Sequence, residues 1–263
     1  MHFDMQNGTV RRASGAAGGV SQFAAEVVAR LVARDVSPDG TLRDDLVDRL
    51  LAAVSSGDFA SFETLKPELK RARVSATMLA DHYIPEVARR LGEAWMQDCA
   101  SFAQVTMGVS RLQAILREIG VQWAADASGT AVGPTLLLIL PHGEQHSLGA
   151  MVLAGRLRRL GLSVCLRIAP DVAELVSLLA ARQFDGALIS IACEDKLETC
   201  RKLVETIRHA SGGRMSVVVG GALLERCDTI VDLTGADAAT NDIDRALSAL
   251  GLSERQAAML EPA

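Results

Sequence analysis

The chain has 263 residues, and its 27 Lys and Arg against 32 Asp and Glu give a formal net charge of −5. Apolar residues make up 49% of it and aromatic residues only 3%. This composition is typical of a soluble globular protein with room for two modest hydrophobic cores. An acidic balance with so few stacking rings argues against a general nucleic-acid binder, so we expect no direct DNA binding.

Neither a membrane span nor an export signal is visible. The longest purely apolar run, at 136–140, is far shorter than the roughly 20 residues that cross a bilayer. Residues 1–20 are polar and rich in Gly, Ala and Ser, without the apolar centre of a signal peptide. We therefore expect a cytoplasmic protein with no membrane partner and a flexible N-terminus over residues 1–20.

Apolar residues recur at helical spacing from Ser21 to Trp123. Breaks at the stretches SPDG (37–40) and SSGD (55–58), and around 98–101, divide this half into segments. No run of β-branched residues alternates with period two. The pattern predicts a helical bundle over residues 21–130, and its helices include 61–70, 75–95 and 101–123.

A different pattern follows the small, Gly-containing stretch at 124–134, which we interpret as a linker. The strand candidates are short and mostly apolar, and they lie at 135–140, 163–168, 186–191, 216–219 and, more weakly, 235–239. Helical segments alternate with them, at 149–160, 171–183, 195–210 and 243–250. This alternation predicts a parallel sheet covered on both faces. We therefore expect an α/β, flavodoxin-like doubly wound domain of Rossmann-like build over residues 131–263.

In such a sheet, ligands bind beyond the carboxyl ends of the strands. Three polar or glycine-containing segments follow predicted strands: PHGEQHSLG at 141–149, SIAC at 190–193, and Gly220-Gly221. They come from separate parts of the chain to one edge of the sheet, where we expect a site. The sequence has no GxGxxG, GxxxxGK[ST] or GxSxG motif, so dinucleotide, P-loop and hydrolase chemistry lack their signatures.

Glu144-x-His146-x-x-Gly149, followed by Ser190 and Gly220-Gly221, resembles the DxHxxG…SxL…GG motif of the cobalamin-binding domain family. The helical half resembles the bundle that caps the upper face of the corrin in such proteins. Within the family, the chain looks most like the stand-alone AerR/PpaA-type antirepressors of photosynthetic bacteria. The resemblance covers residues 61–250.

This resemblance implies a cobalt site. His146 would be the lower axial ligand through a neutral imidazole nitrogen, and Glu144 would accept a hydrogen bond from the other ring nitrogen. Ser190 would hydrogen-bond that carboxylate in turn. Above the corrin, Trp95 would contact its upper face.

The resemblance also implies a path for the nucleotide tail of the cofactor. Gly149 and the pair Gly220-Gly221 would supply backbone without side chains where the tail passes. Phe102 and Met107 are expected to belong to the core of the bundle, and His142 to be a plain loop residue.

Three departures from the family pattern bear on these expectations. Glu144 replaces the usual Asp, and the motif after the third strand reads Ser190-Ile191-Ala192 rather than SxL. Light-sensing cobalamin regulators carry Glu-His after the Trp with nine residues between them, whereas this chain has Val105-Thr106 at those positions. A photoswitch that is locked by that histidine is therefore not expected.

The resulting expectation is a non-enzymatic, light-responsive transcriptional regulator that binds hydroxo- or adenosylcobalamin. It would act as an antirepressor by binding a repressor protein of the photosynthesis-gene type. Two alternatives remain open: a corrinoid carrier of a methyltransferase system, against which Glu144 counts, and a haem-binding redox sensor on the same fold.

Overall fold

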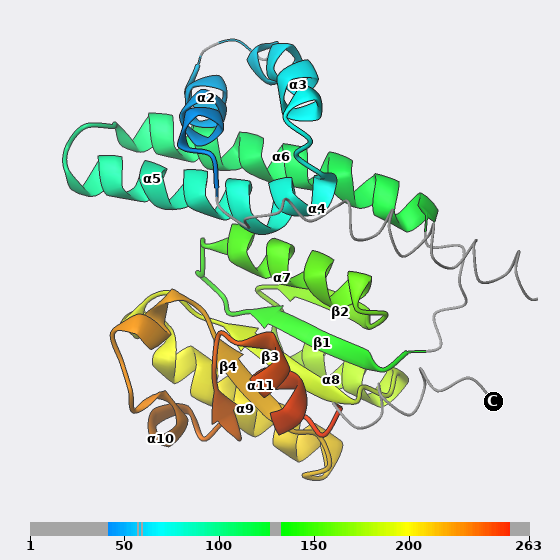
Figure 1. Cartoon of the computed structure of the whole chain (residues 1–263). Coiled ribbons are helices and arrows are strands. Elements are labelled where there is room, and N and C mark those ends of the chain that lie inside the picture. The colour runs from blue at the N-terminus through cyan, green and yellow to red at the C-terminus, as the bar shows by residue number, and fades with distance from the viewer. Residues whose placement is uncertain (1–41, 57, 59, 127–132, 253–263) are drawn as a thin grey trace, which may run out of the picture.

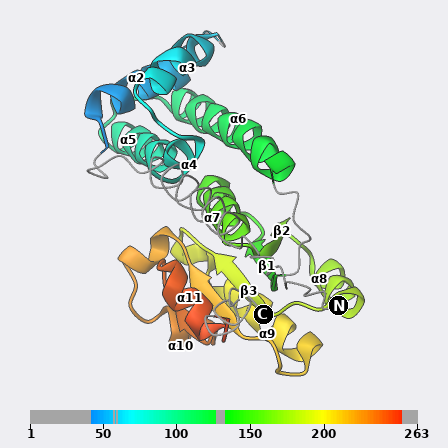
Figure 2. The ribbon, with the colours of Figure 1, turned by 45° about the vertical axis from the view of Figure 1, so that its right-hand side comes forward.

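The computed structural model describes residues 42–56, 58, 60–126 and 133–252 of the chain. A helical bundle sits on top of a five-stranded α/β half, and the helix α7 lies between them (Figures 1 and 2). The flexible N-terminus expected over 1–20 and the helical segment that begins at Ser21 lie outside the described residues.

The bundle consists of α2 (Asp44–Ser55), α3 (Ser61–Arg71), α4 (Ala76–Met78), the π-helical turn η1 (Leu79–Tyr83), α5 (Ile84–Met96) and α6 (Phe102–Asp126). The single helix predicted over 75–95 is therefore a helical run with a π turn inside it. Such turns insert an extra residue and are frequent at functional sites. Gly108 allows α5 and α6 to approach closely, since a Cβ there would lie 2.8 Å from Cδ1 of Leu91.

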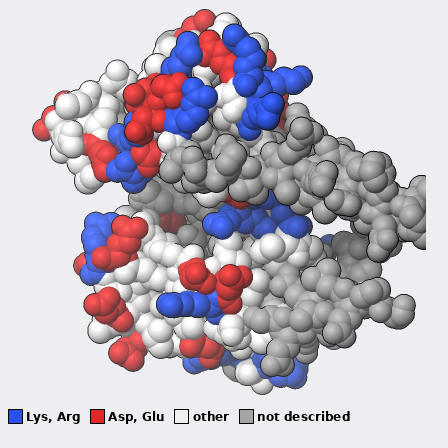
Figure 3. All heavy atoms as spheres, viewed as in Figure 1, with Lys and Arg blue, Asp and Glu red and all other residues white. Residues whose placement is uncertain are grey.

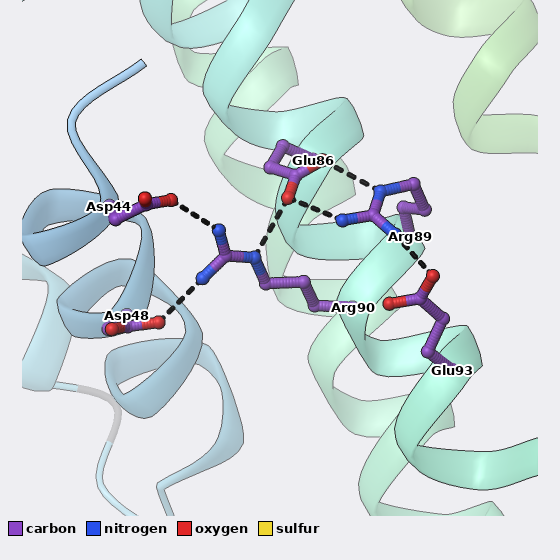
Figure 4. A network of polar contacts seen from close by, with 6 residues as sticks. All are labelled: Asp44, Asp48, Glu86, Arg89, Arg90 and Glu93. Atoms are coloured by element: carbon purple, nitrogen blue, oxygen red, sulfur yellow. Dashed lines mark hydrogen bonds and ion pairs between the residues drawn. The ribbon is translucent and has the colours of Figure 1, made fainter. Parts of the chain in front are cut away.

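A network of ion pairs joins α2 to α5 on the outside of the bundle (Figure 4). Arg90 reaches both Asp44 and Asp48 on α2, at 2.6 Å each. Glu86 accepts hydrogen bonds from Arg89 and Arg90, which lower the pKa of its carboxyl to about 2. The network therefore fixes α2 against α5 through ion pairs.

The sheet consists of β1 (Thr135–Leu140), β2 (Ser163–Ile168), β3 (Gly186–Ser190), β4 (Val217–Gly220) and β5 (Ala238–Ala239). All pairs are parallel, in the order β2-β1-β3-β4-β5. The strand order reverses between β1 and β3, which is where doubly wound sheets bind ligands. The predicted fold class, a helical bundle followed by a doubly wound parallel sheet, is confirmed.

Helices cover both faces of the sheet. On one face, α7 (Ser147–Arg159) and α11 (Ile243–Ala249) pack on Leu138, Leu188 and Val218. The other face is covered by α8 (Val172–Ala181), α9 (Leu197–Ser211) and α10 (Ile230–Thr234). Two 3₁₀ turns, η2 (Glu194–Lys196) and η3 (Ala222–Glu225), follow β3 and β4. Because both faces are buried, β1, β3 and β4 are mostly apolar rather than alternating, whereas the edge strand β2 is only partly buried and includes Ser163 and Arg167.

The bundle is attached to the sheet half through α7. Leu148 and Val152 of α7 are part of the hydrophobic core of the bundle. Asp81 lies in the π turn, and its Oδ1 and Oδ2 accept hydrogen bonds from Nη2 of Arg159 at 2.5 and 2.6 Å. The helix α7 therefore belongs to both halves. Among the described residues, no helix is long and apolar enough to cross a membrane.

Candidate functional site

The loop between β1 and α7 carries His146, the residue that immediately precedes the first turn of α7. Gly143 turns this loop with a φ of +75°, and the N–H of Glu144 donates to the carbonyl of Pro141 at 3.1 Å. Lys196 closes over the loop, because a Cβ on Gly143 would lie 3.1 Å from its Nζ. The backbone that carries His146 is thus held in a tight turn at the carboxyl edge of the sheet.

Glu144 is buried beneath this loop, with 2% of its side chain exposed. Its Oε1 accepts the backbone N–H of His146 at 2.9 Å and lies 2.6 Å from Nδ1 of the His146 ring. Its Oε2 accepts the backbone N–H of Ala192 at 2.8 Å. Burial raises the pKa of the Glu144 carboxyl, but these hydrogen bonds outweigh burial and hold the pKa below its ordinary value. The group is therefore a charged acceptor that fixes the ring.

The hydrogen bond to Glu144 decides which nitrogen of His146 is available. An ionised carboxylate can only accept, so the Nδ1 that faces it carries a proton, and in the neutral form of the ring Nε2 then has the lone pair. The side chain of His146 is 65% exposed. A carboxylate behind one imidazole nitrogen and an open second nitrogen are the usual features of a metal-ligating histidine.

Ser190 does not make the hydrogen bond that was expected. Within the described residues, both oxygens of Glu144 are bonded to His146 and Ala192, with no bond from the Ser190 hydroxyl. The reason is the length of the side chain, since Glu reaches one methylene further than Asp and meets the backbone beyond the strand end. The departure from the family pattern therefore changes the partner of the carboxylate without releasing the imidazole.

Beside this loop, a cavity of about 520 Å³ opens between α7, the sheet and α11. Its floor is apolar and is formed by Leu138, Leu188 and Val218. The predicted binding residues that line it are Gly149, Ser190, Gly220 and Gly221. Residues from three separate segments of the chain thus meet at one opening, as the strand-end argument predicted.

The two glycines Gly221 and Gly149, which line the cavity, differ in what a side chain would meet there. Gly221 has a φ of +113°, and a Cβ there would collide with the backbone carbonyl of Ile191, so the fold itself requires glycine. Gly149 is different, because a Cβ there would meet nothing within 4 Å. Glycine inside a helix costs about 1 kcal/mol relative to alanine. The described part of the chain therefore leaves space for a side chain at this position on the cavity wall.

The end of the α5–α6 hairpin extends past the beginning of α7 (Figure 1). Gln113 of α6 donates to Oγ of Ser147 at 2.9 Å, so this face of α6 is directed at the His146 loop. Thr106 and Phe102, seven and eleven positions earlier, lie on the same helix face because 3.6 residues make one turn. Both side chains are exposed. An uncovered helix face therefore looks toward the side of the sheet that carries His146.

The expectation that Phe102 and Met107 belong to the core is wrong, since they are 67% and 46% exposed. The first turns of α6 pack on the bundle through other positions, such as Val105 and Gly108, so helical spacing alone does not bury these two side chains. Trp95 is also exposed, near the end of α5. In the described part of the chain it makes no hydrogen bond with the His146 loop and does not line the cavity, so its predicted contact with a corrin stays a prediction.

Three groups at this site could not be predicted from the sequence. The N–H of Ala192 has no side-chain signature, and Gln113 and Arg156 read as ordinary residues of amphipathic helices. Only the knowledge that α6 and α7 pack together would have placed Gln113 beside Ser147 and Arg156 in the cavity wall.

A helical bundle on a doubly wound parallel sheet is a fold that is also found in a solved corrinoid protein. The monomethylamine corrinoid protein of Methanosarcina barkeri shares it with a TM-score of 0.64 and 16% identity, over 81% of this chain and 100% of that one. For a cobalamin-binding protein from Desulfitobacterium hafniense DCB-2, the TM-score is 0.39 and the identity 15%, over 80% of this chain and 98% of that one. No protein-family model matches the chain.

A relative in sequence defines the family more narrowly. The chain is 44% identical over 190 residues to a 20.5 kDa protein of Rhodobacter capsulatus from the bchF-crtJ intergenic region. The alignment spans 72% of this chain and 99% of the relative. The chain belongs to the family of that protein. Its assignment to the AerR/PpaA type stays a prediction.

Proposed function

We propose that the chain binds cobalamin through His146 and acts as a non-enzymatic, light-responsive regulator that relieves repression by binding a repressor protein. The observation that carries this proposal is the exposed imidazole of His146, which Glu144 holds on the loop before α7, three residues ahead of Gly149 in the wall of the 520 Å³ cavity. A ligand for the metal and a recess for an attached group lie side by side at one edge of the sheet.

The residues present fit a corrinoid with a nucleotide tail. His146 would ligate cobalt from below, while Gly149 and the Gly220-Gly221 pair leave room for the tail. The chemistry that cobalamin supplies when bound is a cobalt centre whose upper ligand can be exchanged or cleaved by light. Haem has no nucleotide tail, so the cavity favours cobalamin over the haem alternative.

Regulation is supported by the link between the His146 loop and the bundle. Gln113 on α6 is hydrogen-bonded to Ser147, the residue that follows His146. A change in the position of this loop is therefore transmitted to α6, and a rearranged bundle gives a partner protein a surface to distinguish. The relative from the bchF-crtJ region fits a role in photosynthesis gene control. Such a regulator would meet its repressor in the cytoplasm.

A corrinoid carrier of a methyltransferase system is the second candidate. It is favoured by the likeness in fold to the monomethylamine corrinoid protein, which spans the whole of that chain. Its test is methyl transfer to or from the loaded protein in the presence of a methyltransferase.

The cofactor is tested by absorption spectra of the purified protein with hydroxocobalamin, adenosylcobalamin and haemin, for the wild type, His146→Ala and His142→Ala. We expect the cobalamin spectrum to shift on binding to the wild type, and the shift to be lost in His146→Ala. His142 is the matched control, because it is exposed on the same loop but is not held by a carboxylate. A shift that survives in His146→Ala, or binding of haemin alone, would contradict the proposal.

Regulation is tested separately, by co-purification of the candidate repressor with apo protein and with cobalamin-loaded protein in the dark and after illumination. We expect the retained amount to depend on the cofactor and on light. Equal retention in all three states would argue against cofactor control and leave the cofactor result unaffected.

A further inference from the structure

Arg156 stands out among the residues that line the cavity. It is the only cation in that wall within the described part of the chain. It follows Gly149 by seven residues on α7, which places it on the same face of the helix about 10 Å further along. Its guanidinium lies where the wall of the cavity meets the π turn of the bundle, near Asp81.

The guanidinium of Arg156 makes only a long ion pair with the bundle. Its Nε lies 3.9 Å from Oδ2 of Asp81, which is beyond hydrogen-bond distance. Asp81 is instead engaged by Arg159 at 2.5 and 2.6 Å. The Arg156 side chain is 48% exposed, and basic side chains gather along α7 between the two halves (Figure 3). Arg156 is therefore available to a ligand.

The walls of the cavity specify what such a ligand carries. The floor is apolar and suits a flat ring, whereas the α7 side presents a positive charge. Two carboxylates, Glu225 and Asp242, line the opposite side near β4 and β5, and that of Asp242 already caps α11 by accepting the N–H of Arg245 at 2.8 Å. An anionic group is thus favoured on the α7 side and disfavoured across the cavity.

We propose that Arg156 binds the anionic phosphodiester of the nucleotide tail of the corrinoid, so that tight binding requires a tail with its phosphate. This inference rests on the proposed cofactor. A guanidinium suits a phosphate group because its planar fork of donors matches two phosphate oxygens. Arg156 then selects for the tail, while His146 selects for the metal.

The test compares three ligands in their aquo forms: hydroxocobalamin, cobinamide phosphate, which lacks the base, and cobinamide, which lacks both base and phosphate. Dissociation constants are measured by absorption titration for the wild type, Arg156→Met, Arg156→Lys and Arg158→Met. The last variant removes the same charge from the same helix outside the cavity, where Arg158 donates to the carbonyl of Val164.

We expect Arg156→Met to weaken hydroxocobalamin and cobinamide phosphate by about tenfold each and to leave cobinamide unchanged, since a charge-assisted contact is lost only where the phosphate is present. Arg156→Lys recovers part of the loss, and Arg158→Met matches the wild type. An unchanged affinity in Arg156→Met, an equal loss for all three ligands, a loss for hydroxocobalamin alone, or an equal loss in Arg158→Met would overturn the inference. If the wild type binds none of the three, the proposed cofactor is wrong and the inference falls with it.

Discussion

At the scale of single residues, Glu144 holds His146 in the orientation that ligation requires. Replacement by Gln keeps the length of the side chain but puts an NH₂ group where one of the three N–H donors of His146 and Ala192 needs an acceptor. We expect Glu144→Gln to destabilise the protein by about 1 to 3 kcal/mol, because a buried donor is left unsatisfied. We also expect weaker cobalamin binding, measured by absorption titration.

The pH dependence of this contact follows from the depressed pKa of Glu144. A carboxyl whose pKa is lowered in the folded state stabilises the protein at pH values above its ordinary pKa. This stabilisation is lost as the pH falls through the folded-state pKa. Chemical denaturation at a series of acid pH values should therefore show a contribution in the wild type that is absent in Glu144→Gln. Equal stabilities of the two proteins at neutral pH would contradict this account of the loop.

What the sequence could predict at this scale was the identity of the carboxylate–imidazole pair. Glu144 and His146 stand two positions apart after an apolar strand, and that spacing is visible without a structure. The expected hydrogen bond from Ser190 to the second carboxylate oxygen was wrong. The backbone N–H of Ala192 donates to that oxygen instead, and it reaches Glu144 only because β3 ends beside β1 in the sheet. Contacts to backbone groups across strands carry no sequence signal.

At the scale of secondary-structure elements, two glycines at the cavity should respond to alanine in opposite ways. Gly149→Ala adds a methyl group to open space in a helix, so we expect the apo protein to gain up to about 1 kcal/mol. The same methyl group intrudes into the cavity, so we expect cobalamin to bind more weakly. Thermal unfolding of the apo protein and absorption titration measure the two effects.

Gly221→Ala is the contrasting variant. It places a Cβ against the carbonyl of Ile191 at a φ of +113°, and we expect it to destabilise the apo protein by about 2 kcal/mol or more. If Gly149→Ala left cobalamin affinity unchanged, Gly149 would not border the ligand. If Gly221→Ala were as stable as the wild type, the turn after β4 would not need glycine.

The elements that the sequence predicted best are those with a continuous run of mostly apolar residues. The ranges of β1 and β2 agree with the apolar runs at 135–140 and 163–168. By contrast, β5 has only two residues, and the short helix α10 (Ile230–Thr234) had no prediction at all. Short elements depend on neighbours that are distant in sequence, and so does the π turn, whose residues fit the periodicity of an ordinary helix.

At the scale of the whole molecule, the placement of the bundle on α7 was beyond prediction from sequence. Asp81 and Arg159 are 78 positions apart, and neither lies in a motif. Their pairing follows from the packing of Leu148 and Val152 into the bundle core. The same packing leaves the start of α6 uncovered, which is why helical periodicity alone wrongly placed Phe102 and Met107 in the core.

In this arrangement Asp81 links the bundle to α7, and the variant Asp81→Asn tests how much this link contributes to stability. The side chain is 11% exposed and binds Arg159 through both oxygens. We therefore expect the free energy of unfolding of the apo protein to fall by about 2 kcal/mol and its Tm by about 5 °C. Thermal unfolding followed by circular dichroism measures both. Asp45→Asn is the control, since its ion pair with Arg43 is more than half exposed and should contribute little.

Cobalamin should narrow the difference between Asp81→Asn and the wild type if it contacts both halves. A ligand that is held by His146 below and by the uncovered face of α6 above stabilises their docking in place of the lost ion pair. A ligand that contacts only the sheet half would instead raise both Tm values by similar amounts, because it does not depend on how the bundle is seated. The size of the remaining difference at saturating hydroxocobalamin therefore reports whether the bundle takes part in binding.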